Sequence, residues 1–157
     1  MASMPEGTVT FLFSDVEGST QLLERHGTAM GNALARHHTL FEEIVGRRHG
    51  VIFETIGDAV YAAFARPADA VASAVDAHRA LATEDWGPIG RLAVRIAVHT
   101  GAVERRGSHY FGSALFRAAR LGPSGTASRP CCPVLRRASS QIRSRRAPRF
   151  ATLARTA

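Results

Sequence analysis

Two short apolar segments, residues 8–14 and 51–56, constrain the fold most, because each ends beside an aspartate and a glycine. Both segments are rich in Val, Ile, Phe and Thr, as β-strands are. Between them, apolar residues recur at the spacing of a helix, which indicates a helical connection. A strand–helix–strand unit returns parallel to its start. We therefore expect Asp15 and Asp58 at the same edge of one sheet.

The two aspartates predict a cation site. Carboxylates that are held close together repel each other unless a cation lies between them. We therefore predict a divalent-metal site for phosphate chemistry. The alternative is that Asp58 serves only as a turn former, as Gly-Asp pairs usually do, but its pairing with Asp15 favours the metal site.

The connection between the two segments is expected to form helix in two pieces. Ser19 or Thr20 is a suitable helix N-cap. Gly27 and Gly31 are expected to divide the helical stretch, and Gly50 to end it.

The second part of the chain repeats the pattern of strand, helix and strand. Residues 60–64 form a third strand, and only residues 57–59 separate it from the second, which predicts a tight hairpin. A helix over residues 68–81 follows, with Pro67 at its first position. A fourth strand is expected at residues 91–100, where apolar and polar residues alternate. The helix is expected to form its apolar face from four residues: Val71, Val75, His78 and Leu81.

These elements define a fold class. Residues 101–109 form a polar arm that is compatible with a hairpin, and residues 113–121 form a short helix with Arg117 and Arg120. The order strand, helix, strand, strand, helix, strand is that of the ferredoxin-like split unit, an α+β layer architecture.

The chain resembles the catalytic domain of class III nucleotide cyclases, in particular the bacterial and mycobacterial-type members. The matching pieces occur in the family's order at residues 7–20, 54–59, 99–101, 110–112 and 117–121. The resemblance covers roughly residues 5–121, so we expect a partial cyclase domain over residues 1–121. The strands and helices that follow in the family are not recognisable after Leu121.

The resemblance implies a reaction on a nucleoside triphosphate, in intracellular signal transduction. The ribose 3′-hydroxyl attacks the α-phosphorus, pyrophosphate leaves, and a 3′,5′-cyclic nucleotide forms. It implies that Asp15 and Asp58 hold two Mg²⁺ or Mn²⁺ ions, with the backbone carbonyl of Val16 as a further ligand.

The same resemblance implies further substrate contacts. The turn of Glu17, Gly18, Ser19 and Thr20 would offer backbone N–H groups to the phosphates at a helix start. Arg120 matches the family arginine that stabilises charge in the transition state. In the family this arginine comes from the partner subunit, so a homodimer with composite sites is implied.

Three positions depart from the pattern or leave the base open. Glu54 is the residue of guanylate-making members, whereas adenylate-making members carry lysine there. The second base-reading position is His109, where aspartate or cysteine is common, so ATP and GTP both stay open. Phe116 replaces the family's catalytic asparagine and can neither donate to nor orient a ribose oxygen.

Losing one positioned polar contact commonly lowers a rate about 10²–10³-fold. A weak or inactive pseudo-cyclase, acting as a nucleotide-binding or dimerising module, is therefore the alternative function. A truncated, poorly folded fragment is a third hypothesis.

Residues 122–157 differ sharply in composition from the rest. Eight of the 20 arginines lie there, whereas all 13 acidic residues precede residue 105, so this tail supplies the net charge of +7. Its apolar residues show no period, which predicts disorder. Non-specific, salt-dependent contact with nucleic acid is expected of such a tail. The adjacent Cys131 and Cys132 make a poor disulfide and lack metal-ligand spacing.

The remaining features predict a cytoplasmic protein without a membrane segment. No stretch approaches the ~20 apolar residues of a membrane helix, and the N-terminus carries no secretory signal pattern. Three histidines, His37, His38 and His49, lack the partners of a zinc site, and we expect them to be solvated.

Overall fold

The computed structural model describes residues 3–107 and 109–115. In chain order the elements are β1 (Gly7–Val16), α1 (Ser19–His26), α2 (Thr28–Arg47), β2 (Val51–Ile56), β3 (Ala59–Phe64), α3 (Pro67–Thr83), the 3-10 turn η1 (Gly87–Ile89), β4 (Val94–Arg106) and β5 (His109–Phe111). Expectations for Phe116, Arg117, Arg120 and the tail fall outside the described residues.

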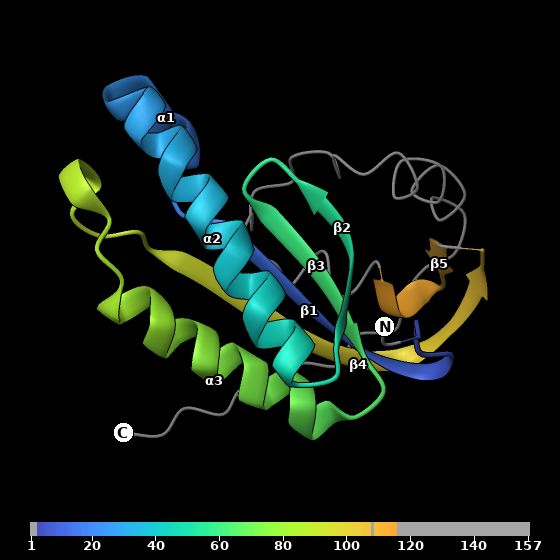
Figure 1. The fold of residues 1–157 in the computed structure, drawn as a ribbon. Coiled ribbons are helices and arrows are strands. Elements are labelled where there is room, and N and C mark those ends of the chain that lie inside the picture. Colours follow the sequence, from blue (N-terminus) through green and yellow to red (C-terminus); the bar gives the residue numbers. More distant parts are fainter. Residues whose placement is uncertain (1–2, 108, 116–157) are drawn as a thin grey trace, which may run out of the picture.

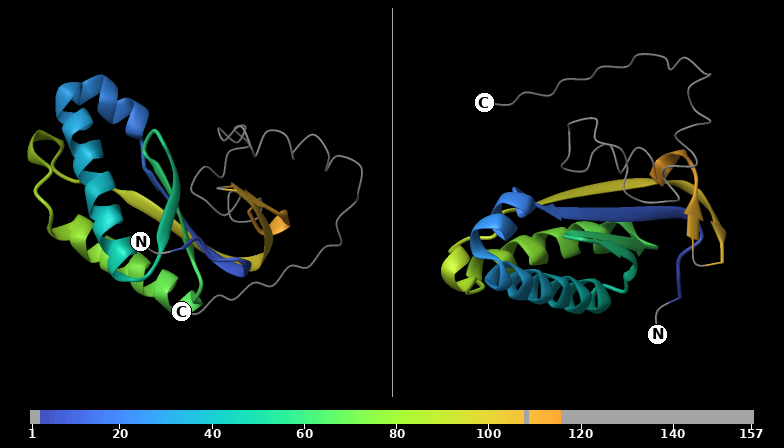
Figure 2. Two further views of the ribbon diagram at one scale, coloured as in Figure 1. Left: turned by 45° about the vertical axis from the view of Figure 1, so that its right-hand side comes forward. Right: turned by 90° about the horizontal axis from the view of Figure 1, so that it is seen from above.

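The strands form one antiparallel sheet in the order β2-β3-β1-β4-β5. Strand β3 lies between β1 and β2 and is antiparallel to both, so β1 and β2 run in the same direction, as expected. The helices α1, α2 and α3 cover one face of the sheet (Figures 1 and 2). This arrangement confirms the ferredoxin-like α+β fold.

The alternation of β1 separates two hydrophobic clusters. Leu12 and Val16 point to the helices and pack in the main core, whereas Phe11 and Phe13 point to the opposite face. On that face, aromatic side chains from four strands contact one another with ring centroids 5.1–6.2 Å apart. We call this set the aromatic face, and it consists of Phe11, Phe13, Phe53, Tyr61 and Tyr110.

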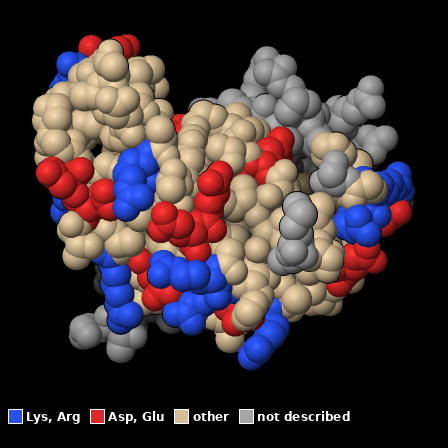
Figure 3. All heavy atoms as spheres, viewed as in Figure 1, with Lys and Arg blue, Asp and Glu red and all other residues tan. Residues whose placement is uncertain are grey.

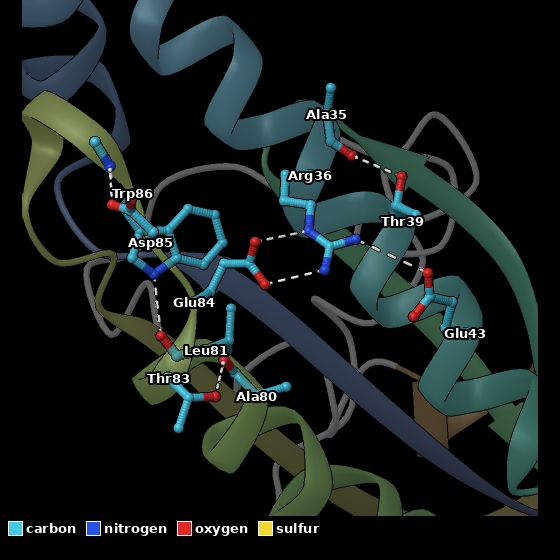
Figure 4. Close-up of polar contacts among 11 residues, drawn as sticks. Ala35, Arg36, Thr39, Glu43, Ala80, Leu81, Thr83, Glu84, Asp85 and Trp86 are labelled. Carbon is cyan, nitrogen blue, oxygen red and sulfur yellow. Dashed lines mark hydrogen bonds and ion pairs between the residues drawn. The ribbon is translucent and has the colours of Figure 1, made fainter.

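Ion pairs and a tryptophan join the helices α2 and α3 to each other and to η1. The Arg36 guanidinium donates two hydrogen bonds to Glu84, at 2.8 and 3.0 Å (Figure 4). Arg48 pairs with Asp76 on α3. The buried Trp86 indole donates to the carbonyl of Leu81 at 3.0 Å. On the side viewed in Figure 1, acidic and basic side chains are accordingly interspersed (Figure 3).

The structure corrects two expectations about the first helices. Helix α1 begins after Gly18, whose φ is +67°, and no side chain caps it, so Ser19 and Thr20 are helical residues and not N-caps. Gly27, with φ +48°, separates α1 from α2 as expected. Gly31 lies inside α2 and does not divide it, because a single glycine in a packed helix is tolerated.

The buried face of α3 is not the expected one. Val71 and Val75 are 54% and 43% exposed, whereas the small residues Ala70, Ser73 and Ala77 are buried together with Leu81. Small side chains allow this helix to lie close to the sheet, and that packing decided the helix rotation.

His37 is also placed differently from the expectation. Its ring is fully buried in α2, where it contacts Phe41 and His38 with ring centroids 4.8 and 5.4 Å apart. The expectation of a solvated His37 was therefore wrong. Helix α2 turns this position toward the sheet along with Leu40 and Ile44.

The fourth strand is longer than expected and begins later. Strand β4 starts at Val94 and continues to Arg106, where the hairpin to β5 begins, which confirms the hairpin in the polar arm. Tyr110 of β5 donates a hydrogen bond to the carbonyl of Pro5 at 2.9 Å.

Among the described residues, no helix has the length and apolar character needed to cross a membrane.

Candidate functional site

Asp15 and Asp58 lie at the same end of the sheet. Asp15 is the penultimate residue of β1, and Asp58 lies in the two-residue turn between β2 and β3. Gly57 precedes it with φ +59°, a conformation that favours glycine. The Asp58 Oδ2 accepts a hydrogen bond from the Val16 amide at 2.8 Å, which fixes this carboxylate against the end of β1.

Asp15 faces a cation that the sequence did not reveal. Arg95 of β4 is its direct partner in the β1–β4 ladder. The Arg95 Nε and Nη2 atoms donate to Asp15 Oδ1 and Oδ2, both at 3.3 Å. Burial raises the pKa of the Asp15 carboxyl, Arg95 opposes this rise, and the charge of Asp58 adds to it. The two aspartates are therefore close enough to repel each other.

The carboxylate oxygens of Asp15 and Asp58 suit a hard divalent cation that also binds a ligand. Among residues 3–107 and 109–115, no group of three or more His, Cys, Asp and Glu side chains could hold a metal ion. The site instead offers two carboxylates. The Val16 N–H faces the Asp58 turn, and in a strand the carbonyl of the same residue points to the same side. Mg²⁺ is commonly held by one or two carboxylates together with substrate phosphates and water.

The start of α1 lies next to these carboxylates. The Glu17 amide donates to the Ala93 carbonyl at 2.8 Å, so the turn is anchored to the segment before β4. Gly18 accepts the first helical hydrogen bond, from Leu22. Because no side chain caps the helix, the first-turn amides, which include those of Ser19 and Thr20, lack partners within the helix.

Glu54 lies on the same sheet face as Asp15. It pairs with Tyr61, which in turn pairs with Phe13, two residues before Asp15 on β1. From strand spacings, the Cα atoms of Glu54 and Asp15 are roughly 12 Å apart. That is a span a nucleotide can bridge between its base and its phosphates.

His109 lies on the opposite edge strand, β5, and its side chain is exposed. The next residue, Tyr110, is buried against Phe53 with ring centroids 5.2 Å apart, and Phe53 precedes Glu54. This aromatic contact brings β5 near β2 across the sheet face. The side chain of His109 alternates away from that of Tyr110.

Two parts of this face were missed by the sequence reasoning. Arg95 lies in an apolar strand, and only the register of β4 against β1 places it opposite Asp15. The alternation of Phe11 and Phe13 was a signal for the aromatic face, but their partners come from distant strands. Residues 113–115 cross β4 closely, since a Cβ at Gly101 would lie 2.4 Å from the Cβ of Ala114.

Comparison with known proteins decides the family. The sequence model of one protein family, the adenylate and guanylate cyclase catalytic domain, matches residues 1–114. The chain belongs to this family. Uncharacterized proteins of Mycobacterium tuberculosis and Mycobacterium bovis are each 38% identical to this chain over a 119-residue alignment that covers 74% of the chain. The chain spans only 39% of the length of these relatives.

Solved cyclase structures share the fold. An adenylate cyclase of Trypanosoma brucei, studied in its monomeric state, superposes with a TM-score of 0.71 at 25% identity, over 74% of this chain and 69% of that one. A dimeric guanylyl cyclase domain of Blastocladiella emersonii gives 0.64 at 23% identity, over 76% of each chain. The guanylate cyclase domain of Catenaria anguillulae in complex with GTP gives 0.64 at 23%, over 73% and 71%.

Proposed function

We propose that this cyclase domain converts a nucleoside triphosphate to a 3′,5′-cyclic nucleotide and pyrophosphate. The observation that carries the proposal is the hydrogen bond from the Val16 amide to Asp58 Oδ2, at 2.8 Å. It joins the β2–β3 turn to the end of β1 and holds two carboxylates at one end of the sheet.

Asp15 and Asp58 would hold two Mg²⁺ or Mn²⁺ ions, with the Val16 carbonyl as a further oxygen ligand. Such ions acidify the attacking hydroxyl and neutralise charge on the phosphates. The amides at the start of α1, beside Glu17, Gly18, Ser19 and Thr20, would bind phosphate oxygens, because unpaired amides and the helix dipole favour an anion there.

The base would lie over the β2 side of the sheet, where Glu54 would read its edge. A base-reading role of His109 rests on the resemblance alone, because this residue lies on the opposite edge strand and its side chain alternates away from Tyr110. A carboxylate at position 54 accepts hydrogen bonds, and guanine offers N1–H and N2–H₂ donors whereas the adenine edge does not offer this pair. Glu54 therefore favours GTP over ATP. Arg120 would reach the reacting phosphate of the partner subunit's site in a homodimer.

A weak or inactive pseudo-cyclase is the second candidate, and Phe116 is the observation that favours it. An apolar ring stands where the family has a polar residue that positions the ribose. Such a protein would still bind nucleotide and metal through Asp15 and Asp58.

The deciding experiment is mass-spectrometric detection of product from GTP and from ATP with Mn²⁺, with the Asp58→Ala variant alongside. We expect cyclic nucleotide from the wild type only. Product that persists in Asp58→Ala would overturn the metal assignment. A folded wild type that is stabilised by nucleotide but forms no product would establish the pseudo-cyclase.

A further inference from the structure

We infer that the Arg95 guanidinium competes with a divalent cation for the Asp15 carboxylate. This competition would set how tightly the site binds the cation. This inference rests on the proposed metal site. It adds a residue that determines metal affinity and that makes no bond to the metal.

The register of the sheet fixes the contact between Arg95 and Asp15. Asp15 and Arg95 are direct partners in the ten-residue ladder between β1 and β4, the longest pairing in the sheet. Cross-strand partners have their side chains on the same face within reach of each other. The guanidinium is therefore held beside Asp15 by two rigid strands and not by a mobile loop.

The contact uses the oxygens that a cation needs. Arg95 donates to both Asp15 oxygens, and Val16 donates to one Asp58 oxygen. Three of the four carboxylate oxygens at the site thus already accept hydrogen bonds. A dication that approaches Asp15 is repelled by the guanidinium, so the two positive groups compete for one carboxylate.

The Arg95 side chain is partly solvated. It is 42% exposed, whereas that of Asp15 is 21% exposed. A long, partly solvated side chain can move its charge into water without leaving a buried charge behind. The carboxylate itself stays fixed by its strand. Metal entry is therefore expected to displace the guanidinium and to leave the sheet unchanged.

The test measures Mn²⁺ binding to the full chain without nucleotide, by electron paramagnetic resonance of free Mn²⁺. Arg95→Gln is expected to bind Mn²⁺ roughly three- to tenfold more tightly than the wild type, as removal of a competing charged hydrogen bond predicts. Arg95→Lys keeps the charge but loses the two-pronged contact, and we expect an intermediate affinity.

Arg105→Gln is the matched control. Arg105 lies near the other end of β4 and pairs with Glu6, so its removal changes the net charge equally but leaves the site intact. Its Mn²⁺ affinity is expected to equal that of the wild type. Circular dichroism and thermal unfolding establish that each variant is folded. If Arg95→Gln does not fold, Arg95→Lys is the variant that tests the inference.

The outcomes separate this inference from the proposed function. Equal or weaker Mn²⁺ binding by both Arg95 variants, with saturable binding lost in Asp58→Asn, overturns the role of Arg95 and leaves the metal site standing. Equal tightening by Arg95→Gln and Arg105→Gln also overturns it, because net charge then explains the effect. If no variant binds Mn²⁺ saturably, both the inference and the metal site fail.

Discussion

Asp58 has a structural role and a proposed chemical role, and a substitution can separate the two. The Asp58 carboxylate accepts the Val16 amide and also supplies negative charge beside Asp15. An asparagine side chain keeps an oxygen that accepts the amide but carries no charge.

Asp58→Asn is therefore expected to preserve the thermal unfolding temperature while lowering Mn²⁺-dependent product formation about 10²–10³-fold, as loss of a positioned electrostatic group does. Mass spectrometry of the product and a thermal melt measure the two effects. Asp76→Asn is the control, since Asp76 pairs with Arg48 between helices and its loss should leave product formation unchanged. Wild-type turnover by Asp58→Asn would contradict the proposed role.

The buried His37 makes stability depend on pH. Both ring nitrogens lack a hydrogen-bond partner among the described residues, and burial lowers the pKa of His37 to about 4. The unfolded chain binds the proton near pH 6.5. Between these values the unfolded state carries more protons, so the free energy of unfolding falls as the pH falls, by roughly 3 kcal/mol over the window.

Urea unfolding at pH 7.5 and pH 5 tests this effect. His37→Leu is expected to lose less stability than the wild type between the two pH values, because its side chain cannot take up a proton. His78→Gln, at an exposed position of α3, should retain the wild-type pH dependence. Identical pH profiles for His37→Leu and the wild type would refute the assignment.

At the scale of elements, the helices are positioned by packing that local pattern does not reveal. Helix α3 turns its small residues to the core and leaves two valines in solvent. An apolar stripe on a helix thus indicated amphipathicity here but not which face is buried, because close approach to the sheet favours alanine and serine.

Two adjacent residues of α3 test this orientation. Ala70 is fully buried, so Ala70→Leu is expected to lower the free energy of unfolding by about 1–3 kcal/mol through overpacking. Val71 is 54% exposed, and Val71→Gln should change it by less than about 0.5 kcal/mol. Urea denaturation measures both, and the opposite ranking would show that the helix is rotated as the sequence pattern suggested.

At the scale of the whole molecule, the proposed active site needs two chains. The described residues contain the two carboxylates, whereas Arg120 is assigned to the partner's site by family resemblance. Within a closed two-fold dimer, each proposed site would take its aspartates from one subunit and its arginine from the other.

Mixing two inactive variants tests this composite arrangement. Asp58→Ala and Arg120→Ala are each expected to be inactive alone, whereas an equimolar mixture should regain about a quarter of the wild-type activity, because half of the dimers then contain one intact site. Product formation after mixing and exchange is the measurement, and sedimentation establishes that dimers form. No recovery in mixed dimers would place both groups in the same chain's site.

Particular residues show how far the sequence carried the prediction. Gly57 and Asp58 between two β-like segments sufficed to predict the hairpin, because turn conformation is a local property. Asp15 could be joined to Asp58 because the connection rule for strand–helix–strand units is nearly general. Glu54 and His109 could be singled out by resemblance, but their placement on opposite edge strands came from the sheet order.

The sequence by itself determined the order of elements, the hairpin, the ferredoxin-like class and the aspartate pair, since these follow from local periodicity, turn chemistry and chain connection. Only the tertiary structure decided the partner of Asp15, the buried face of α3 and the burial of His37. Those features depend on register and on helix rotation, which are set by contacts between residues far apart in the chain. Arg95 and Asp15 are 80 positions apart, and only the β1–β4 ladder makes them neighbours.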